Sequence, residues 1–180
     1  MSSNLDLGFF DRMRFGWGKN TVRILLDLDG SVAAEGKLPE GSYLPFSGSG
    51  YATWQVRVRV LEWIAEKRQD ERVELLWSTT WQQYANSILE ESNIEPIEWL
   101  SFDDTYQNPG DWYKRDGIRL FLEDAPDPIV IVDDELPPAL LALDNPRILA
   151  IKPNSLSGLT DAELERIDSF VEDYRNRKIR

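Results

Sequence analysis

Five short apolar runs are spaced along the chain, and helix-like or loop segments separate them. Short apolar runs of this kind suit strands that are buried on both faces of a sheet. Strands that alternate with helical segments indicate βαβ units, so we expect an α/β fold with a mostly parallel central sheet. The predicted strands are residues 22–28, 73–77, 97–100, 129–132 and 148–151.

The segments between these runs carry helix or loop signals. Residues 30–51 are rich in Gly, Ser and Pro, so we expect a loop or flap there that is too short for a large cap domain. Apolar residues from Val56 onward predict a helix that ends near Arg68. Further helical patterns occupy residues 81–91 and 111–122.

The last helix has the clearest start signal. Residues 160–163 read Thr-Asp-Ala-Glu, the form of a capping box, whose first and fourth side chains satisfy backbone N–H groups at the helix start. We therefore expect a helix to begin at about residue 161. Its apolar residues follow at helical spacing, at Leu164, Ile167, Phe170 and Val171.

Composition bounds the organisation of the chain. Its 180 residues, 42% of them hydrophobic, suit one globular domain, which we place at residues 21–180 behind an N-terminal extension of residues 1–20. The extension has the pattern of neither a signal peptide nor a membrane span, and the absence of cysteine fits a reducing compartment. We therefore expect a cytoplasmic protein with no membrane contact. Besides the extension, the expected frayed end is the basic tail, with Arg175, Arg177, Lys178 and Arg180.

The chain also has no histidine, and this narrows the chemistry. The missing residue types exclude an imidazole base, a Ser-His or Cys-His nucleophile, and a zinc site with His or thiolate ligands. Carboxylate, amine and hydroxyl groups remain. Oxygen ligands favour a hard cation, which we interpret as Mg²⁺ beside a phosphate.

Two aspartates stand where the first predicted strand ends. Asp27 and Asp29 are one residue apart in Leu-Asp-Leu-Asp-Gly, and open α/β sheets bind ligands at the carboxyl ends of their strands. At this spacing on a strand both side chains point the same way, so one carboxylate could attack a phosphorus atom while the other protonates the leaving oxygen. Alone, the same pattern also occurs where a strand runs into a turn.

Three further groups follow along the chain. Residues 78–80, Ser-Thr-Thr, come after the second strand and could hold a phosphoryl oxygen, or they could form only a helix N-cap. Lys114 supplies a positive charge, although a single lysine is more often a solvated helix residue. Asp133 and Asp134 come after the fourth strand and suit a cation.

These groups, in this order, resemble the haloacid dehalogenase superfamily over residues 22 to about 134. A narrower resemblance covers most of the chain and is to the small haloacid dehalogenase domains of Swiss Army Knife RNA-repair proteins. It implies a three-layer Rossmann-like fold with a mostly parallel sheet and a minimal cap or none. It rests on residues 76–81 (Leu-Trp-Ser-Thr-Thr-Trp), Ala85-Asn86, Trp112-Tyr113-Lys114, Val132-Asp133-Asp134 and Gly158-Leu159-Thr160.

The resemblance also implies catalytic roles. The first Asp of the superfamily is the nucleophile that forms an aspartyl phosphate, which implies this role for Asp27, with Asp29 as general acid and base. The narrower resemblance implies Thr79 as the hydroxyl that binds the phosphoryl group, and the broader pattern implies Ser78 instead. Lys114 would steady the phosphoryl group and the nucleophile.

The implied cofactor is Mg²⁺. Its ligands would be the Asp27 carboxylate, the Asp29 backbone carbonyl, Asp133, and Asp134 directly or through water. Ser31 is a mild departure, since Thr is common at that position in the superfamily.

The function implied by the resemblance is Mg²⁺-dependent hydrolysis of a phosphomonoester through an aspartyl phosphate. An acid at Asp29 favours a phosphatase or phosphotransferase, because a dehalogenase needs no acid there and the ion pumps carry Thr. The implied substrate is a phosphorylated small molecule, or a nucleotide or nucleic-acid end. The alternative is a phosphate-binding or protein-interaction module that has the same fold without turnover.

The net charge of −12 opposes broad binding to nucleic acid, because the surface repels phosphates. A nucleic-acid substrate would therefore need a local basic patch. Arg115 and Arg119 beside Lys114, or the tail from Arg175, could supply one.

Tryptophans near the predicted site fit base stacking or, more commonly, core packing. They are Trp77, Trp81 and Trp112.

Overall fold

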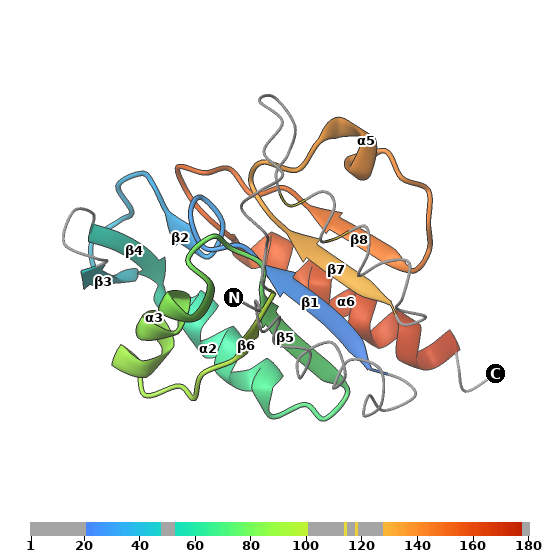
Figure 1. The fold of residues 1–180 in the computed structure, drawn as a ribbon, viewed down its shortest axis with the longest axis horizontal. Coiled ribbons are helices and arrows are strands. Elements are labelled where there is room, and N and C mark those ends of the chain that lie inside the picture. Colours follow the sequence, from blue (N-terminus) through green and yellow to red (C-terminus); the bar gives the residue numbers. More distant parts are fainter. Residues whose placement is uncertain (1–20, 48–52, 101–113, 115–117, 119–127, 178–180) are drawn as a thin grey trace, which may run out of the picture.

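The central element of the fold is a five-stranded parallel sheet, seen in a computed structural model that describes residues 21–47, 53–100, 114, 118 and 128–177 (Figure 1). The strand order is β6-β5-β1-β7-β8, and each neighbouring pair is parallel. This confirms the predicted α/β class with a mostly parallel central sheet. The strands are β1 (Val22–Leu26), β5 (Val73–Trp77), β6 (Glu98–Trp99), β7 (Ile129–Val132) and β8 (Ile148–Ile151).

All five predicted apolar runs form strands, but two of them are shorter than expected. β1 ends at Leu26, and Leu28 lies in the turn that follows. Leu28 is nevertheless fully buried, so its apolar character reflects core packing under the turn and not a longer strand. β6, one of the two edge strands, covers only Glu98–Trp99, since its ladder to β5 holds two residue pairs.

The strand order places a topological switch point between β1 and β7. Along the sheet, the strands of the chain come third, second, first, fourth and fifth, so the winding direction reverses beside the first strand. Open α/β sheets bind ligands at such a point, outside the carboxyl ends of the two strands. In this chain those ends lead directly to Asp27 and Asp133.

The sheet buries a core on each face, because successive side chains of a strand point to opposite faces. In β1, Ile24 and Leu26 belong to one apolar cluster and Leu25 to the other. Two helices, α2 (Val58–Arg68) and α6 (Asp161–Arg177), pack against the first face. The two helices are joined by a hydrogen bond from the Trp63 indole to the Asp168 carboxylate, 2.8 Å long.

The second face is described in part. The predicted helix of residues 111–122 lies outside the described residues except for Lys114 and Ile118. The Ile118 N–H donates to the Lys114 carbonyl over 2.9 Å, which is the i to i−4 bond of a helical turn, and Ile118 packs in the second cluster. The short helix α5 (Pro138–Leu141) contributes Leu140 to the same cluster.

The helix α6 begins where the capping box predicts. The Thr160 N–H donates to the Glu163 carboxylate over 2.8 Å, which is one half of the box. The other half differs, because the Thr160 hydroxyl also donates to that carboxylate and the Glu163 N–H bonds instead to the Thr160 carbonyl. Among the residues that the structure describes, no helix has both the length and the apolar character needed to cross a membrane.

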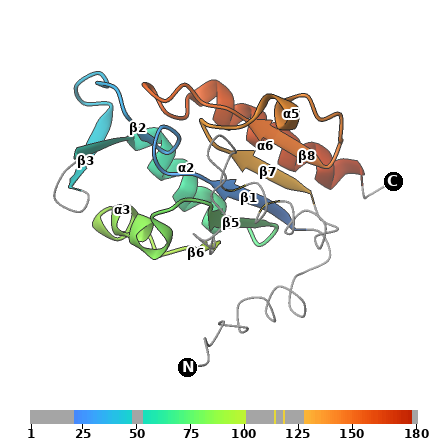
Figure 2. The same ribbon diagram turned by 45° about the horizontal axis from the view of Figure 1, so that its top comes forward.

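A second, small antiparallel sheet lies on the side toward which β1 runs (Figures 1 and 2). Its order is β2-β4-β3, with β2 (Ala33–Ala34), β3 (Tyr43–Ser47) and β4 (Thr53–Arg57). The segment 30–51 therefore contains strands where a loop or flap was expected. Because β2 starts just after Asp29, this sheet borders the predicted site.

The prediction that Val56 opens a helix is wrong. Val56 lies in β4, where it is fully buried and pairs with Ala33 and Leu44, and α2 begins at Val58. The stretch alternates Trp54 buried, Gln55 half-buried and Val56 buried, which is the period of a strand. The alternation continues into the helix sequence, so the boundary is invisible in the apolar pattern.

The predicted helix of residues 81–91 is present in two parts, a 3₁₀ turn η1 (Gln82–Ala85) and the helix α3 (Asn86–Glu91). Gln82 has a φ of 47°, in the left-handed region that L-residues rarely adopt. Of the basic tail, Arg175 and Arg177 lie within α6, where a frayed end was expected. The predictions for residues 1–20 and 178–180 lie outside the described residues.

Candidate active site

Three neighbouring strands, β5, β1 and β7, are followed by polar residues at the edge of the sheet that their carboxyl ends form. The Asp27 N–H donates to the Val132 carbonyl over 2.9 Å, and the Asp133 N–H donates to the Ile151 carbonyl over 3.1 Å. The Ser78 N–H donates to the Leu26 carbonyl over 2.7 Å. Each of these residues is therefore held by backbone hydrogen bonds that continue the sheet by one position.

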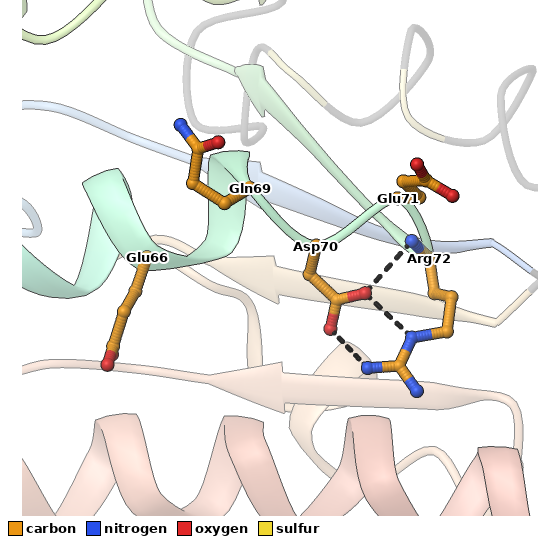
Figure 3. Close-up of a pocket in the computed structure, with 5 residues that line it drawn as sticks. All are labelled: Glu66, Gln69, Asp70, Glu71 and Arg72. Atoms are coloured by element: carbon orange, nitrogen blue, oxygen red, sulfur yellow. Dashed lines mark hydrogen bonds and ion pairs between the residues drawn. The ribbon is translucent and has the colours of Figure 1, made fainter.

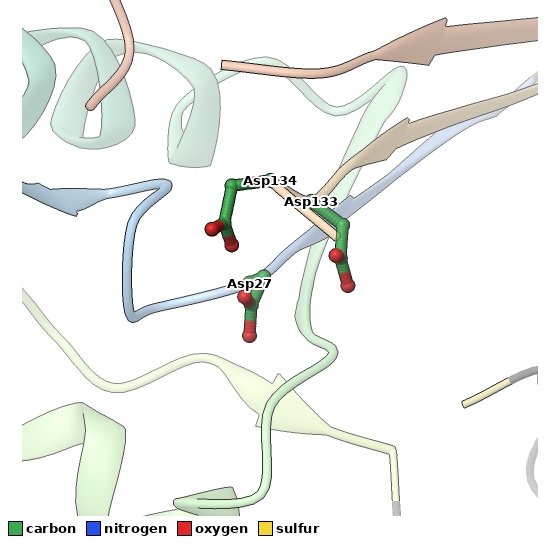
Figure 4. Close-up of side chains that lie close together, drawn as sticks. All are labelled: Asp27, Asp133 and Asp134. Carbon is green, nitrogen blue, oxygen red and sulfur yellow. The ribbon is translucent and has the colours of Figure 1, made fainter. Parts of the chain in front are cut away.

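The carboxylates of Asp27, Asp133 and Asp134 converge at this edge (Figure 4). One carboxylate oxygen from each lies within 4.8 Å of the other two. Asp27 and Asp133 are buried, at 6% and 1% exposure, whereas Asp134 is half-buried. The predicted pairing of the first Asp with the later acidic pair is thus present in the geometry.

Lys114 lies between two of these carboxylates. Its Nζ is 2.6 Å from Asp27 Oδ1 and 2.6 Å from Asp133 Oδ2, and the side chain is 2% exposed. The interpretation of Lys114 as a solvated helix residue is therefore wrong. The second oxygen of Asp133, Oδ1, accepts the Glu135 N–H over 2.8 Å, so both oxygens of this carboxylate are engaged.

The charges of the group do not cancel. When ionised, the three carboxylates carry three negative charges and Lys114 carries one positive charge, which leaves two negative charges in a mostly buried space. A charge of this size taken out of water is costly unless a counter-ion binds. A divalent cation has the charge that would balance it.

The electrostatics of Asp27 and Asp134 reflect this imbalance. Burial raises the pKa of Asp27 to about 7, with Asp133 acting in the same direction and Lys114 opposing it. Burial, followed by the charges of Asp133 and Glu135, raises the pKa of Asp134 to about 6. Both groups thus favour a nearby positive charge, which would stabilise their ionised forms.

Two residues just after Asp29 shape the position of Asp134. The Asp134 N–H donates to the Ser31 hydroxyl over 3.0 Å, and Ser31 is fully buried. Gly30 has a φ of 66°, and a Cβ on it would lie 2.5 Å from both Cγ and Oδ2 of Asp134. Position 30 therefore needs glycine for its conformation and for space, which the sequence pattern alone does not reveal.

Asp29 is held in a different way from Asp27. Because β1 ends at Leu26, the strand alternation that predicts a shared direction for the two side chains does not extend to Asp29. Asp29 forms an isolated bridge with Ala33, and its carboxylate accepts the indole N–H of Trp81. Its predicted metal contact uses the backbone carbonyl and stays a prediction.

The two candidate hydroxyls differ in their partners. Thr79 is 1% exposed, and its Oγ1 accepts the Trp81 backbone N–H over 3.4 Å. Ser78 is also buried, and its Oγ has no hydrogen-bond partner among the described residues. A buried hydroxyl without a partner is rare and fits a group that binds a ligand. Ser78 therefore stays beside Thr79 as a candidate.

The tryptophans near the site have separate roles. Trp77 is fully buried, and its indole donates to Asn86 Oδ1 over 2.9 Å. Asn86 in turn bonds to both the N–H and the carbonyl of Ile97, so it ties β5 to the segment before β6. Trp77 is thus a core residue, whereas Trp81 reaches Asp29. Trp112, Arg115 and Arg119 lie outside the described residues, as do the side chains of Arg175 and Arg177.

A surface depression lies at the opposite edge of the sheet, the one formed by the amino ends of the strands, just before the start of β5 (Figure 3). It is lined by Glu66, Gln69, Asp70, Glu71 and Arg72. Asp70 Oδ1 accepts Arg72 Nε over 2.7 Å, and Oδ2 accepts Nη2 over 2.8 Å. The hydrogen bond from the Arg72 side chain lowers the pKa of Asp70. This paired surface turn lies at the amino end of β5, away from the carboxylates.

Asp27, Asp133, Asp134 and Lys114 thus form one group at the switch point, with Asp29 and the hydroxyls of residues 78 and 79 on segments that follow β1 and β5. Sequence reasoning named Ser31 and Trp81 but missed the bond of Ser31 to Asp134 and the bond of Trp81 to Asp29, since neither pair forms a recognisable pattern along the chain. Comparisons of the chain with protein-family models, with curated proteins and with solved structures give no match.

Proposed function

We propose that this chain is a Mg²⁺-dependent phosphomonoester hydrolase of the haloacid dehalogenase type, acting through an aspartyl phosphate on Asp27. The observation that carries the proposal is the sharing of one buried ammonium, that of Lys114, by Asp27 and Asp133. These two carboxylates follow adjacent strands at the switch point of a parallel sheet. That is where such sheets bind phosphorylated ligands.

The residues at the site fit a magnesium ion. Three carboxylates converge within 4.8 Å, and hard divalent cations prefer oxygen ligands. Asp27, Asp133 and Asp134 would hold the ion, with the Asp29 backbone carbonyl as a further ligand. When bound, Mg²⁺ offsets the repulsion between a phosphate dianion and the carboxylates.

The protein groups divide the reaction into two steps. In the first, a carboxylate oxygen of Asp27 attacks phosphorus, the bond to the leaving oxygen breaks, and Asp29 gives that oxygen its proton. In the second, water attacks the phosphorus of the aspartyl phosphate, Asp29 takes the proton from the water, and phosphate leaves with Asp27 restored. Lys114 orients Asp27 and offsets charge on the phosphoryl group, and a hydroxyl of Ser78 or Thr79 holds a phosphoryl oxygen.

The surroundings of the site support a proposal for the substrate class. The small sheet of β2, β3 and β4 borders the site, and the described residues contain no large cap domain. An open site admits phosphorylated ends of large molecules, and a nucleotide or nucleic-acid end is the substrate we propose. The chain charge of −12 restricts contact to the end itself.

A phosphatase screen of the full chain tests the proposal. We expect release of phosphate from mononucleotides, or from 3′- or 5′-phosphorylated oligonucleotides, that stops in EDTA and returns with Mg²⁺. Asp27→Asn should abolish release, because an amide is a poor nucleophile. It should leave the fold intact, since Lys114 keeps its 2.6 Å contact with Asp133.

The matched control is Asp144→Asn, which changes an exposed aspartate and should keep full activity. Turnover by Asp27→Asn near the wild-type rate would remove Asp27 from its role. A wild-type chain that releases no phosphate, yet gains thermal stability from added phosphate and Mg²⁺, would favour the alternative of a binding module without turnover.

A further inference from the structure

The carboxylate of Asp29 is not positioned by the central sheet. β1 ends three residues earlier, and the described backbone contact of Asp29 with a strand is its single bridge to Ala33. A proton donor must be held within hydrogen-bond reach of the reacting atom, so a turn residue needs another restraint. That restraint is visible in the contact between the Trp81 indole and Asp29 Oδ2.

Trp81 is itself held from two sides. Its ring meets the ring of Trp54 edge to face, with centroids 4.7 Å apart and planes at 90°. Its backbone N–H donates to Thr79 Oγ1. Trp54 belongs to β4 of the small sheet, and Thr79 follows β5 of the central sheet. Both sheets therefore fix the ring that touches Asp29.

The chemistry of the indole suits a positioning role. An indole N–H donates one hydrogen bond and accepts none, and it does not take part in proton transfer. Because Oδ2 accepts the indole N–H, the other oxygen of Asp29, Oδ1, is the one left to face the substrate. We propose that Trp81 is a positioning residue that aims Asp29 Oδ1 at the leaving oxygen, an inference that rests on the proposed function.

In the first step, the proton moves from Asp29 Oδ1 to the leaving oxygen as the bond between phosphorus and that oxygen breaks. In the second step, the attacking water returns a proton to Oδ1. The indole N–H stays on Oδ2 throughout. Loss of the indole N–H should therefore impair protonation of the leaving group while phosphate binding by Lys114 and the cation continues.

The test is Trp81→Phe, which removes the N–H and keeps an aromatic ring against Trp54. Its kcat is measured on two esters, p-nitrophenyl phosphate, whose leaving group needs little protonation, and an alkyl phosphate, whose leaving group needs it. We expect kcat to fall at least about tenfold further on the alkyl ester than on the aryl ester, with little change in KM.

The matched control is Trp63→Phe. It removes an indole N–H that also donates to an aspartate, Asp168, but between α2 and α6. This variant should leave the ratio of the two kcat values unchanged, even if it lowers stability. A second readout is the indole ¹⁵N–¹H signal of Trp81, assigned by its absence in Trp81→Phe, which should move in Asp29→Ala.

The outcomes separate this inference from the proposed function. An active wild type whose kcat ratio is the same in Trp81→Phe would overturn the inference alone, and so would an indole signal that Asp29→Ala does not move. An equal loss on both esters would make Trp81 merely structural. A wild type that releases phosphate neither from these esters nor from phosphorylated nucleotides would overturn the proposed function and, with it, the role of Asp29 as the acid.

Discussion

At the scale of single residues, the site is a balance between buried charges and the few groups that offset them. Lys114 contacts two carboxylates, and Asp133 receives both an ammonium and a backbone N–H. The Asp134 N–H donates to the Ser31 hydroxyl. Among the described residues, however, the Asp134 carboxylate forms no ion pair with a basic side chain. The unbalanced charge therefore concentrates on Asp134, which predicts that its removal stabilises the metal-free protein.

Asp134→Asn should raise the free energy of unfolding of the metal-free protein by about 1 kcal/mol at pH 8. The reasons are the loss of a partly buried charge and, after it, the loss of repulsion from Asp133, both discounted for the solvent screening of a half-exposed group. The same change should weaken cation binding, so the rise in Tm on adding Mg²⁺ should shrink. Unfolding by urea and thermal scans with and without Mg²⁺ measure both effects.

Asp144→Asn serves as the control for this prediction, because it removes one negative charge from an exposed position. It should change neither the stability in EDTA nor the shift with Mg²⁺. If Asp134→Asn destabilises the metal-free protein or keeps the full Mg²⁺ effect, Asp134 is not the unbalanced ligand that the geometry indicates.

At the scale of elements, two turns differ in what they contribute. The turn after β1 carries Asp29, Gly30 and Ser31 and determines where Asp134 lies. The turn before β5 carries the hydrogen-bonded pair Asp70 and Arg72 at the other edge of the sheet, away from the carboxylates. Each turn gives a prediction that can be tested against a matched control variant.

Gly30→Ala should lower both stability and cation binding. The added Cβ would lie 2.5 Å from the Asp134 carboxyl group, and alanine also disfavours a φ of 66°. Gly41→Ala is the matched control, because Gly41 has a φ of 80° but nothing within 4 Å of the added Cβ. Both variants should lose about 1 kcal/mol from conformation, and Gly30→Ala should lose the Mg²⁺-dependent rise in Tm as well. Equal Mg²⁺ effects in the two variants would contradict the contact with Asp134.

Asp70→Asn should lower Tm by about 1–2 °C at pH 7. Arg72 lowers the pKa of Asp70 in the folded state, so ionised Asp70 stabilises the fold above its unfolded pKa of 3.8 and this contribution fades as pH falls through the folded pKa. The difference between variant and wild type should therefore shrink as pH falls below 3.8 and vanish below the folded pKa of Asp70. Glu71→Gln, an exposed neighbour, should show no such pH-dependent difference. A difference that grows in acid would refute the sign.

At the scale of the whole molecule, shape and charge act on the substrate in opposite ways. The open site that we propose would admit a large phosphorylated molecule, while the net charge of −12 repels a long polyanion. Only the end of a nucleic acid is then expected to make close contact. This balance predicts how the rate depends on substrate length and on salt.

A phosphorylated mononucleotide or short oligonucleotide should be processed about as well as a long one. Because few phosphates are neutralised, log kcat/KM should fall with log salt with a slope shallower than about −2. Measurement of kcat/KM across a length series at several salt concentrations decides this. A steep gain with length that salt removes would indicate an extended nucleic-acid groove, and activity confined to sugar phosphates or phosphoproteins would reject the nucleotide substrate.

The fold class was accessible from sequence because its signals are local. The apolar run before Asp27 predicts a strand that is buried on both faces, and this strand is β1. The capping box at residues 160–163 marks the start of a helix with only four residues. Val56 shows the limit of such signals, because an alternating apolar pattern continued from a strand directly into a helix. Local patterns give the type of an element more reliably than its ends.

By itself, the sequence determined that carboxylates follow the first and fourth strands and that imidazole and thiolate chemistry is absent. The resemblance added Lys114 as a partner for them. Only the tertiary structure decided that Lys114 is buried, with its Nζ 2.6 Å from a carboxylate oxygen of both Asp27 and Asp133. It also decided that the Trp81 indole donates a hydrogen bond to Asp29. The physical reason is distance along the chain. A periodic pattern of apolar residues reports on residues that are neighbours within one helix or strand. Contacts between residues 27, 114 and 133 depend instead on the order in which the strands pair.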